Sequence, residues 1–274
     1  MPELPEVETW RRALHGWMVG RRLSAIHVLE PTSVRATLST RPSPPAPSLL
    51  RSIEAGAGCE VVGTDRHGKR MAIQVGDAWW LVHLGMTGRF ERSGSEAPPH
   101  ARVGWELDGG EVVWFRDARR FGGVVPLGAR GDLADGLGPD ALHTLDGPQL
   151  SRRFSGRRAV KVALLDQGCL AGLGNIHAAE ALWRAGIDPR RPVGEVPPDA
   201  WERLAAAIPA QLHDALAEMP SVEDFVYVTD GGDNPFAVYG RADEPCRRCA
   251  TSIQRVVQGG RSTFWCPGCQ PASP

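Results

Sequence analysis

Four cysteines near the C-terminal end of the chain have the spacing of a tetrahedral metal site. They form two C-x-x-C pairs separated by sixteen residues: Cys246 with Cys249, and Cys266 with Cys269. Each pair can direct two thiolates at one ion, and residues 250–265 are long enough for a two-stranded hairpin. Two disulfides or four unrelated thiols are the alternatives, but we expect no secretory segment in this chain. We therefore expect one structural Zn²⁺, because four sulfur ligands leave no open position for water.

Short motifs along the rest of the chain also have residue types that can do chemistry. They are MPELPEVE at 1–8, HGKR at 67–70, HLGMTG at 83–88, RDARRFG at 116–122, LLDQ with GLGNI at 164–176, VYGR at 238–241 and GGR at 259–261. In this order they resemble the motifs of the formamidopyrimidine-DNA glycosylases, which are base-excision enzymes of bacteria. The resemblance runs nearly from end to end of the chain.

The resemblance implies that Pro2 is the nucleophile once Met1 has been removed. Its secondary amine would attack the anomeric carbon of a nucleotide and form an iminium, and the reaction would need no metal. A chain-terminal amine is neutral in roughly a tenth of molecules at pH 7, far more often than an unperturbed lysine. The structural alternative is simple, because prolines and acids are ordinary in the first turn of a helix.

Three more residues belong to the catalytic group that the resemblance implies: Glu3, Glu6 and Lys69. Glu3 adjoins the nucleophile and would be the acid and base that helps to open the sugar ring and moves protons during elimination. Glu6 would support it, or would only complement the helix dipole. Lys69 lies at a turn between predicted strands and would reach the lesion and its phosphates, although a solvated lysine is the alternative.

A glycosylase must evert its target nucleotide and fill the gap that remains in the base stack. Met86, Arg119 and Phe121 match the three residues that do this in the family. A methionine is a flexible apolar wedge, a phenylalanine can enter a base step, and an arginine can bond the orphaned base. Core packing is the alternative for Met86 and Phe121.

The remaining expected DNA contacts are His100, Arg102, Lys161, Asn175, Tyr239 and Arg261. Asn175 and nearby backbone amides would grip a phosphate, although a helix cap is an alternative for this asparagine. Lys161 would add charge there, Arg102 would supply a cation, and Arg261 at the tip of the finger hairpin would take another phosphate.

Composition describes an ordinary globular protein of 274 residues, with 42% hydrophobic residues, 23% charged residues and a formal net charge of −1. Apolar stretches such as residues 78–84 are too short to cross a bilayer. The bulk charge does not indicate a nucleic-acid partner, but the local charge does. Residues 151–161 contain five positive charges and no acid, and residues 114–120 contain three arginines and one aspartate.

Hydrophobic periodicity predicts the elements that must position these residues. Apolar spacing over residues 3–18 indicates a helix, and short β-type runs follow at 23–29, 70–75, 78–84, 103–107, 112–115 and 123–127. Helical runs follow at 160–167, 176–185 and 199–219. The expected fold is an α+β, multidomain protein: an N-terminal β-sandwich with a leading helix, then a helix-two-turns-helix module and a zinc ribbon. The expected domains are residues 1–132, 139–230 and 236–274.

These features predict a bifunctional DNA glycosylase and abasic-site lyase that excises oxidised purines, namely 8-oxoguanine and formamidopyrimidines. It would act through a Schiff base on Pro2 followed by β,δ-elimination, on double-stranded DNA lying between the two lobes. An endonuclease VIII-type enzyme for oxidised pyrimidines and a zinc-dependent DNA-binding protein without catalysis are the alternatives. We expect a monomer without membrane contact, cytoplasmic as in bacteria and associated with the nucleoid through DNA.

Some positions depart from the family pattern. His177 and Ala179 replace the tyrosine and the acid that relatives often carry, and the segment 229–237 before VYGR is short. The short segment favours the oxidised-pyrimidine alternative, whereas the N-terminal motif and the set Met86, Arg119 and Phe121 favour oxidised purines. Cys59 and Cys169 stand apart from the metal site, and we expect them to be buried structural thiols.

Overall fold

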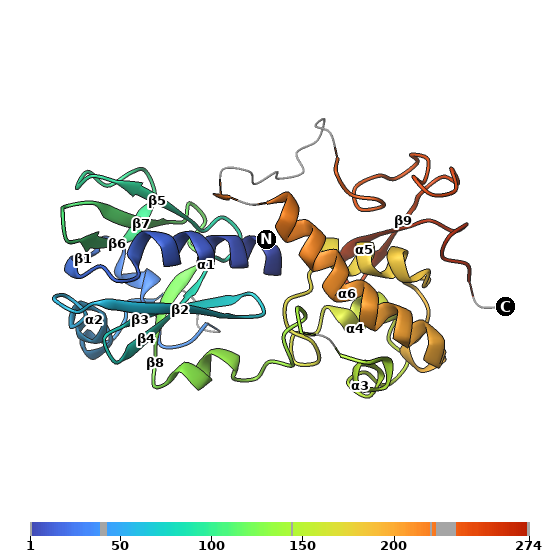
Figure 1. Cartoon of the computed structure of the whole chain (residues 1–274), viewed down its shortest axis with the longest axis horizontal. Coiled ribbons are helices and arrows are strands. Elements are labelled where there is room, and N and C mark those ends of the chain that lie inside the picture. Colours follow the sequence, from blue (N-terminus) through green and yellow to red (C-terminus); the bar gives the residue numbers. More distant parts are fainter. Residues whose placement is uncertain (1, 39–42, 144, 220, 223–233, 273–274) are drawn as a thin grey trace. The chain divides into compact units, whose positions relative to one another are not determined.

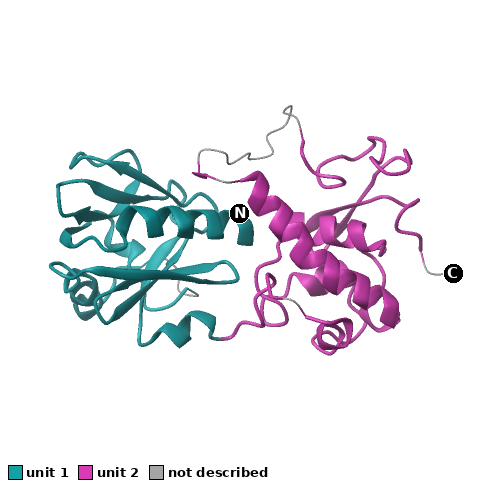
Figure 2. Ribbon diagram, in the orientation of Figure 1, with its two compact units in different colours: residues 1–135 teal, residues 136–274 magenta. Residues whose placement is uncertain are grey.

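A computed structural model describes residues 2–38, 43–143, 145–219, 221–222 and 234–272 (Figure 1). The chain forms two compact units, residues 1–135 and 136–274 (Figure 2). The residues of the expected catalytic group and the gap-filling residues belong to unit 1. The cysteines, Lys161, Asn175, Tyr239 and Arg261 belong to unit 2.

Unit 1 contains two four-stranded antiparallel sheets, with strand orders β1-β6-β7-β5 and β2-β3-β4-β8. The strands are β1 Leu23–Val28, β2 Val61–His67, β3 Arg70–Val75, β4 Ala78–His83, β5 Arg89–Ser93, β6 Ala101–Leu107, β7 Val112–Arg116 and β8 Gly123–Leu127. The central strands carry alternating or consecutive apolar residues because each sheet buries one face in a common core. That core includes Ile73, Trp105 and Phe115, which are almost fully buried. The expected β-sandwich is confirmed.

Helix α1 (Leu4–Met18) closes one side of this sandwich. Its buried residues Leu4, Val7, Leu14 and Met18 recur at helical spacing and face the core. It packs against β2, the edge strand of one sheet, and the Trp10 ring lies 5.5 Å from the ring of Phe90 on β5, the edge strand of the other. The helix therefore covers the two sheet edges that lie nearest the N-terminal residues.

Unit 2 combines a helical module with the finger. Its elements are α3 Gly147–Ser151, α4 Val160–Leu164, α5 Asn175–Ala185, η3 Val193–Glu195, α6 Pro198–Glu218, β9 Gln254–Gln258 and β10 Arg261–Trp265. The predicted hairpin between the cysteine pairs is present as β9 and β10, joined by a turn at Gly259 and Gly260. Both glycines have positive φ, which a two-residue hairpin turn requires. Ala179 of α5 packs in one buried cluster with Ile253, Phe264 and Cys266 of the finger.

Several elements of unit 1 were not predicted. They are the edge strands β2 and β5, helix α2 (Pro47–Glu54) and the short turns η1 (Pro31–Ser33) and η2 (Arg130–Ala134). These two strands carry few apolar residues: β2 reads Val-Val-Gly-Thr-Asp-Arg-His and β5 reads Arg-Phe-Glu-Arg-Ser. Among the described residues, no helix combines the length and the apolar character that a membrane span needs.

Candidate active site and DNA interface

Pro2 and Glu3 lie at the start of α1, and both are buried. Glu3 has an extended backbone conformation at the N-cap position, and Pro5 lies in the first turn, where its missing N–H costs nothing. The Glu6 carboxylate accepts a hydrogen bond from the backbone N–H of Glu3 at 3.0 Å. Glu6 therefore holds the backbone of the residue that follows Pro2, as a supporting residue would.

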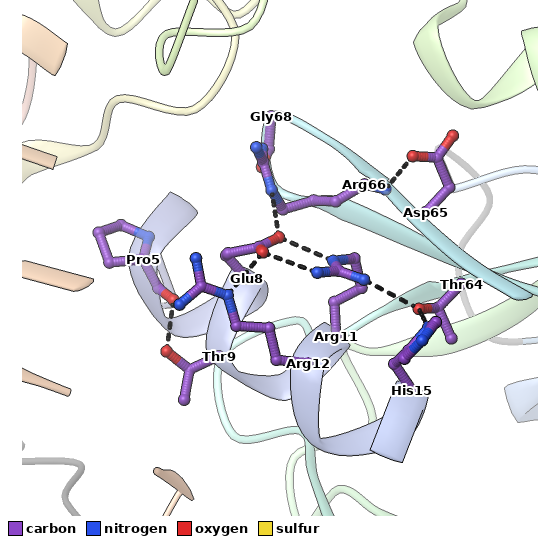
Figure 3. Close-up of polar contacts among 10 residues, drawn as sticks. All are labelled: Pro5, Glu8, Thr9, Arg11, Arg12, His15, Thr64, Asp65, Arg66 and Gly68. Atoms are coloured by element: carbon purple, nitrogen blue, oxygen red, sulfur yellow. Dashed lines mark hydrogen bonds and ion pairs between the residues drawn. The ribbon is translucent and has the colours of Figure 1, made fainter. Parts of the chain in front are cut away.

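Lys69 is half-buried in the two-residue turn between β2 and β3. The preceding Arg66 connects this turn to α1: its Nε donates to Glu8 Oε2 at 3.1 Å, and its Nη1 donates to the backbone oxygen of Gly68 at 2.9 Å (Figure 3). One guanidinium thus links the helix that begins beside Glu3 to the turn that carries Lys69. Sequence reasoning missed Glu8 and Arg66, because neither has a recognisable spacing.

Glu8 is a buried carboxylate that contacts three arginines. Arg11 donates two hydrogen bonds to it at 2.9 Å, Arg12 donates one at 2.9 Å, and Arg66 completes the group (Figure 3). Arg11 also reaches Thr64 of β2 at 3.0 Å. Burial alone would raise the pKa of Glu8, but the hydrogen bonds and charges of the arginines lower it to about 2.

Glu8 is expected to stabilise the fold at neutral pH and to lose this effect in acid. The carboxyl of the folded protein stays ionised to about pH 2 and that of the unfolded chain to about 4.5, so its contribution is complete above pH 4.5 and falls as pH approaches 2. This shift corresponds to at most about 3 kcal/mol. In urea unfolding followed by tryptophan fluorescence, Glu8→Gln should be less stable than the wild type at pH 7, and the difference should narrow towards pH 3.

Asp108→Asn is the matched control for that measurement. Asp108 also pairs with an arginine in unit 1, Arg21, but both side chains are exposed to water. Solvent screens such a pair, so its loss should change the pH dependence little. A constant difference between the wild type and Glu8→Gln from pH 7 to pH 3 would contradict the role given to the ionised carboxylate.

Met86, Arg119 and Phe121 lie close together on two loops of unit 1. Met86 follows β4 and is 38% exposed, and Phe121 precedes β8 and is 48% exposed. The Arg119 guanidinium lies over the Phe121 ring at 4.8 Å. Gly85 has a φ of +62°, and a Cβ there would lie 2.4 Å from the backbone nitrogen of Gly122, so the two loops touch through their backbones. Met86 and Phe121 are too exposed for core packing, which was the alternative for these two residues.

His100 and Arg102 lie beside the second of these loops. His100 is exposed and has a positive φ of 66°, and its backbone oxygen accepts a hydrogen bond from the N–H of Asp117. Arg102 is half-buried, and its Nε donates to the backbone oxygen of Asp117 at 2.9 Å. Arg102 therefore supports the loop that carries Arg119, and its contact with a phosphate stays a prediction.

Three of the predicted DNA contacts, Lys161, Asn175 and Tyr239, meet in unit 2, and a fourth, Arg261, adjoins a residue that they contact. The ammonium of Lys161 donates to the side-chain oxygen of Asn175, and Asn175 Nδ2 lies 3.5 Å from the Tyr239 hydroxyl. Asn175 Nδ2 also donates to the backbone oxygen of Ser262 at 2.9 Å, one residue after Arg261. Lys161 is fully buried, so in this structure it acts on the site through Asn175.

Glu180 is a buried carboxylate that the sequence analysis did not assign to the site. It accepts hydrogen bonds from three successive backbone N–H groups, those of Ala237, Val238 and Tyr239, at 2.8 to 2.9 Å. It therefore fixes Tyr239 against α5. Residues 229–233 of the short segment 229–237 lie outside the described residues.

The geometry of the four finger cysteines fits one tetrahedral ion. Their sulfur atoms lie within 4.8 Å of one another, and three of the distances are 3.4, 3.5 and 3.8 Å. A tetrahedron of Zn–S bonds of about 2.3 Å has sulfur atoms about 3.8 Å apart. Without a cation the thiols differ in acidity: burial and the neighbouring thiols raise the pKa of Cys269 to about 12, whereas hydrogen bonds, first that with Thr251, lower the pKa of Cys249 to about 6. A dication would hold all four as thiolates.

Comparisons with known proteins agree with this architecture. Residues 1–124 match the formamidopyrimidine-DNA glycosylase N-terminal domain, residues 137–225 match the H2TH domain of the same proteins, and residues 243–272 match the zinc finger found in FPG and IleRS. Formamidopyrimidine-DNA glycosylase from Burkholderia thailandensis is 41% identical over 290 residues, covering 98% of this chain and 100% of the relative. The corresponding protein of Magnetococcus marinus is 37% identical, with 99% and 100% covered.

Solved structures give the same result. The MutM (FPG) protein from Thermus thermophilus is 32% identical with a TM-score of 0.78, and each chain is covered to 100%. The Fpg of Lactococcus lactis, in a complex with DNA containing an abasic site, is 26% identical with a TM-score of 0.83, covering 99% of this chain and 100% of that one.

Three family models in chain order, with relatives aligned over nearly the whole length, define a DNA glycosylase that has a helix-two-turns-helix module. The chain belongs to the formamidopyrimidine-DNA glycosylase family. The finger model and the sulfur geometry confirm the expected structural zinc site.

Proposed function

We propose that this protein is a bifunctional DNA glycosylase and abasic-site lyase that removes oxidised purines from double-stranded DNA in base excision repair. Pro2 is the nucleophile once Met1 has been removed, Glu3 is the acid and base, and Lys69 contacts the lesion nucleotide. Family membership over the full length supports this activity. Two of the structural neighbours support the substrate, since they are described in complexes with DNA that contains 8-oxoguanine or an abasic site.

The reaction follows from the chemistry of a secondary amine. The Pro2 nitrogen attacks the anomeric carbon, the bond to the base breaks, and the departing base takes the electron pair. Glu3 protonates the ring oxygen as the sugar opens, which leaves an iminium joined to Pro2. Removal of a proton next to the iminium then expels the 3′ phosphate, and a second elimination expels the 5′ phosphate. The zinc ion takes part in none of these steps.

The observation that carries the proposal of a base-everting glycosylase is the exposed pair Met86 and Phe121, with Arg119 stacked on the phenylalanine. Apolar side chains exposed on adjoining loops mark an interaction surface, and such wedges enter base steps when a nucleotide is everted. A guanidinium beside them can bond the base left without a partner.

Borohydride trapping tests the proposal. The mature protein is incubated with a duplex containing 8-oxoguanine opposite cytosine, reduced, digested and analysed by mass spectrometry. We expect one covalent adduct, on the peptide that begins with Pro2. Trapping on an oxidised-pyrimidine duplex alone would support an endonuclease VIII-type enzyme. Binding without an adduct on the lesion or on an abasic-site duplex, with Pro2 shown to be the first residue, would support a non-catalytic DNA-binding protein.

We also propose a cytoplasmic location and action as a monomer, and bacterial relatives support the first. The division into domains at 1–132, 139–230 and 236–274 stays a proposal as well. Its second and third parts share unit 2, where α5 packs on the finger. Together, Asn175, Tyr239 and Arg261 form the proposed phosphate contact of this unit, with Lys161 orienting the Asn175 carboxamide.

A further inference from the structure

Asp117 joins the two loops that carry Met86, Arg119 and Phe121. Its carboxylate is almost fully buried, at 1% exposed. One oxygen accepts hydrogen bonds from the Thr87 hydroxyl at 2.5 Å and from the backbone N–H of Arg119 at 3.2 Å. The other accepts the backbone N–H of Gly122 at 2.6 Å. Thr87 follows Met86 and Gly122 follows Phe121, so one carboxylate contacts the backbone or a neighbour of all three residues.

Arg35 holds the same loop through its carbonyl groups. It is 7% exposed, and it donates to the backbone oxygens of Arg120 at 2.8 Å and of Phe121 at 3.4 Å. Burial lowers the pKa of Arg35 and the Asp117 charge raises it, so the guanidinium stays protonated at neutral pH. The Asp117 carboxylate thus binds N–H groups of residues 119–122, and the Arg35 guanidinium binds carbonyl groups of the same segment.

The intrinsic conformational preferences of residues 119–122 would not keep the backbone in this conformation. Arg120 has a φ of 59°, a conformation that costs energy for a residue with a side chain. A Cβ at Gly122 would lie 2.6 Å from the backbone oxygen of His83 and 3.1 Å from the Asp117 carboxylate. On the other loop, the Gly85 N–H donates to Nδ1 of His83, whose pKa is lowered first by burial and then by nearby arginines. Both loops are therefore fixed by polar groups that are buried or half-buried.

We propose that Asp117, with Thr87 as its partner, is a positioning residue that presents Met86, Arg119 and Phe121 together before DNA binds. Strained backbone at a functional surface persists only where its surroundings determine it, and here the Asp117 carboxylate and the Arg35 guanidinium do so. Because these three side chains are already in position, no conformational entropy has to be lost to order them when the base leaves the stack. The inference rests on the proposed function, because it gives the loops a role in eversion.

Two substitutions at Thr87 test this inference with little risk to the fold, since Thr87 is exposed. Thr87→Val keeps the shape and removes the donor, and Thr87→Ser keeps the hydroxyl. Asp117→Asn is the more severe variant, because its amide nitrogen would face an N–H donor. On 8-oxoguanine opposite cytosine we expect kcat/KM to fall about tenfold for Thr87→Val and at least that for Asp117→Asn, and Thr87→Ser to retain most of the wild-type value.

A second substrate distinguishes positioning from stability. When the lesion lies opposite a stable abasic analogue, there is no orphaned base to hold and little stacking to replace, so each variant should come within about threefold of the wild type. Equal losses on both substrates would overturn the proposal in favour of a structural role. Full activity of Thr87→Val, or equal loss in Thr87→Ser, would also overturn it.

A binding readout keeps this test separate from the test of the proposed function. In this duplex a stable abasic analogue takes the place of the lesion, and 2-aminopurine is the base opposite it. The fluorescence of 2-aminopurine reports the entry of side chains into the stack. We expect a slower or smaller change for Asp117→Asn and Thr87→Val than for the wild type and Thr87→Ser. Should the wild type bind without excising 8-oxoguanine, the proposed function fails, and this comparison still decides the role of Asp117: identical traces for all variants would refute it.

Discussion

Glu3→Gln is expected to lower excision of 8-oxoguanine by about 10²- to 10⁴-fold at pH 7, which is the range that general acid–base catalysis contributes. Glu3 is buried beside Pro2 at the start of α1, where its carboxyl can exchange a proton with the opening sugar. A glutamine has nearly the same size and cannot carry that proton. Single-turnover kinetics would measure the chemical step, and a gel-shift titration should show duplex affinity within about threefold of the wild type.

Glu6→Gln is the matched control, because it changes the same group of atoms one turn further along the helix. A glutamine at position 6 still offers an oxygen to the N–H of Glu3, so we expect less than about a tenfold loss. Pro2→Gly should abolish excision while binding is retained. A Glu3→Gln protein that excises normally, or that fails to fold, would remove Glu3 from the catalytic role.

The sequence allowed accurate prediction where the pattern is local. Two C-x-x-C pairs fix a finger, and the glycines at 259 and 260 fix the turn that places Arg261 at the hairpin tip. The central strands of the sandwich were predicted because their buried faces are strongly apolar. Strands β2 and β5 were missed because they carry few apolar residues, whereas the other two edge strands, β1 and β8, carry enough apolar residues to be predicted.

The supporting carboxylates could not be predicted for a different reason. Asp117 and Glu180 are buried acids that accept hydrogen bonds from backbone N–H groups, and Glu8 is a buried acid that pairs with Arg66, far along the chain, as well as with two arginines of its own helix. In the sequence an acid beside arginines looks like an exposed charge balanced by its neighbours, as Asp117 does between Arg116 and Arg119. Only the folded backbone shows that these acids satisfy donors that would otherwise be buried without partners. The motifs therefore predicted the candidate residues for the chemistry, while the residues that hold them needed the structure.

Loss of zinc is expected to abolish the finger and to weaken DNA binding at least about tenfold. Cys249→Ser is the variant of choice, because Cys249 is the exposed ligand and its replacement disturbs packing least. Structural zinc contributes about 10–16 kcal/mol in finger peptides, far more than the short hairpin can supply by itself. Elemental analysis should show one zinc per wild-type chain and almost none in the variant.

The expected loss of affinity follows from the contacts that the hairpin makes. The backbone oxygen of Ser262 on β10 holds Asn175 Nδ2, and Arg261 lies beside it, so an unfolded hairpin removes one phosphate contact and disorients another. Each charge-assisted hydrogen bond is worth about 1.5–3 kcal/mol, and 1.4 kcal/mol is a factor of ten in affinity. Cys59→Ser and Cys169→Ser, which change thiols outside the metal site, should keep both zinc and affinity. Wild-type affinity in a zinc-free Cys249→Ser protein would show that the finger does not place Asn175 or Arg261 on DNA.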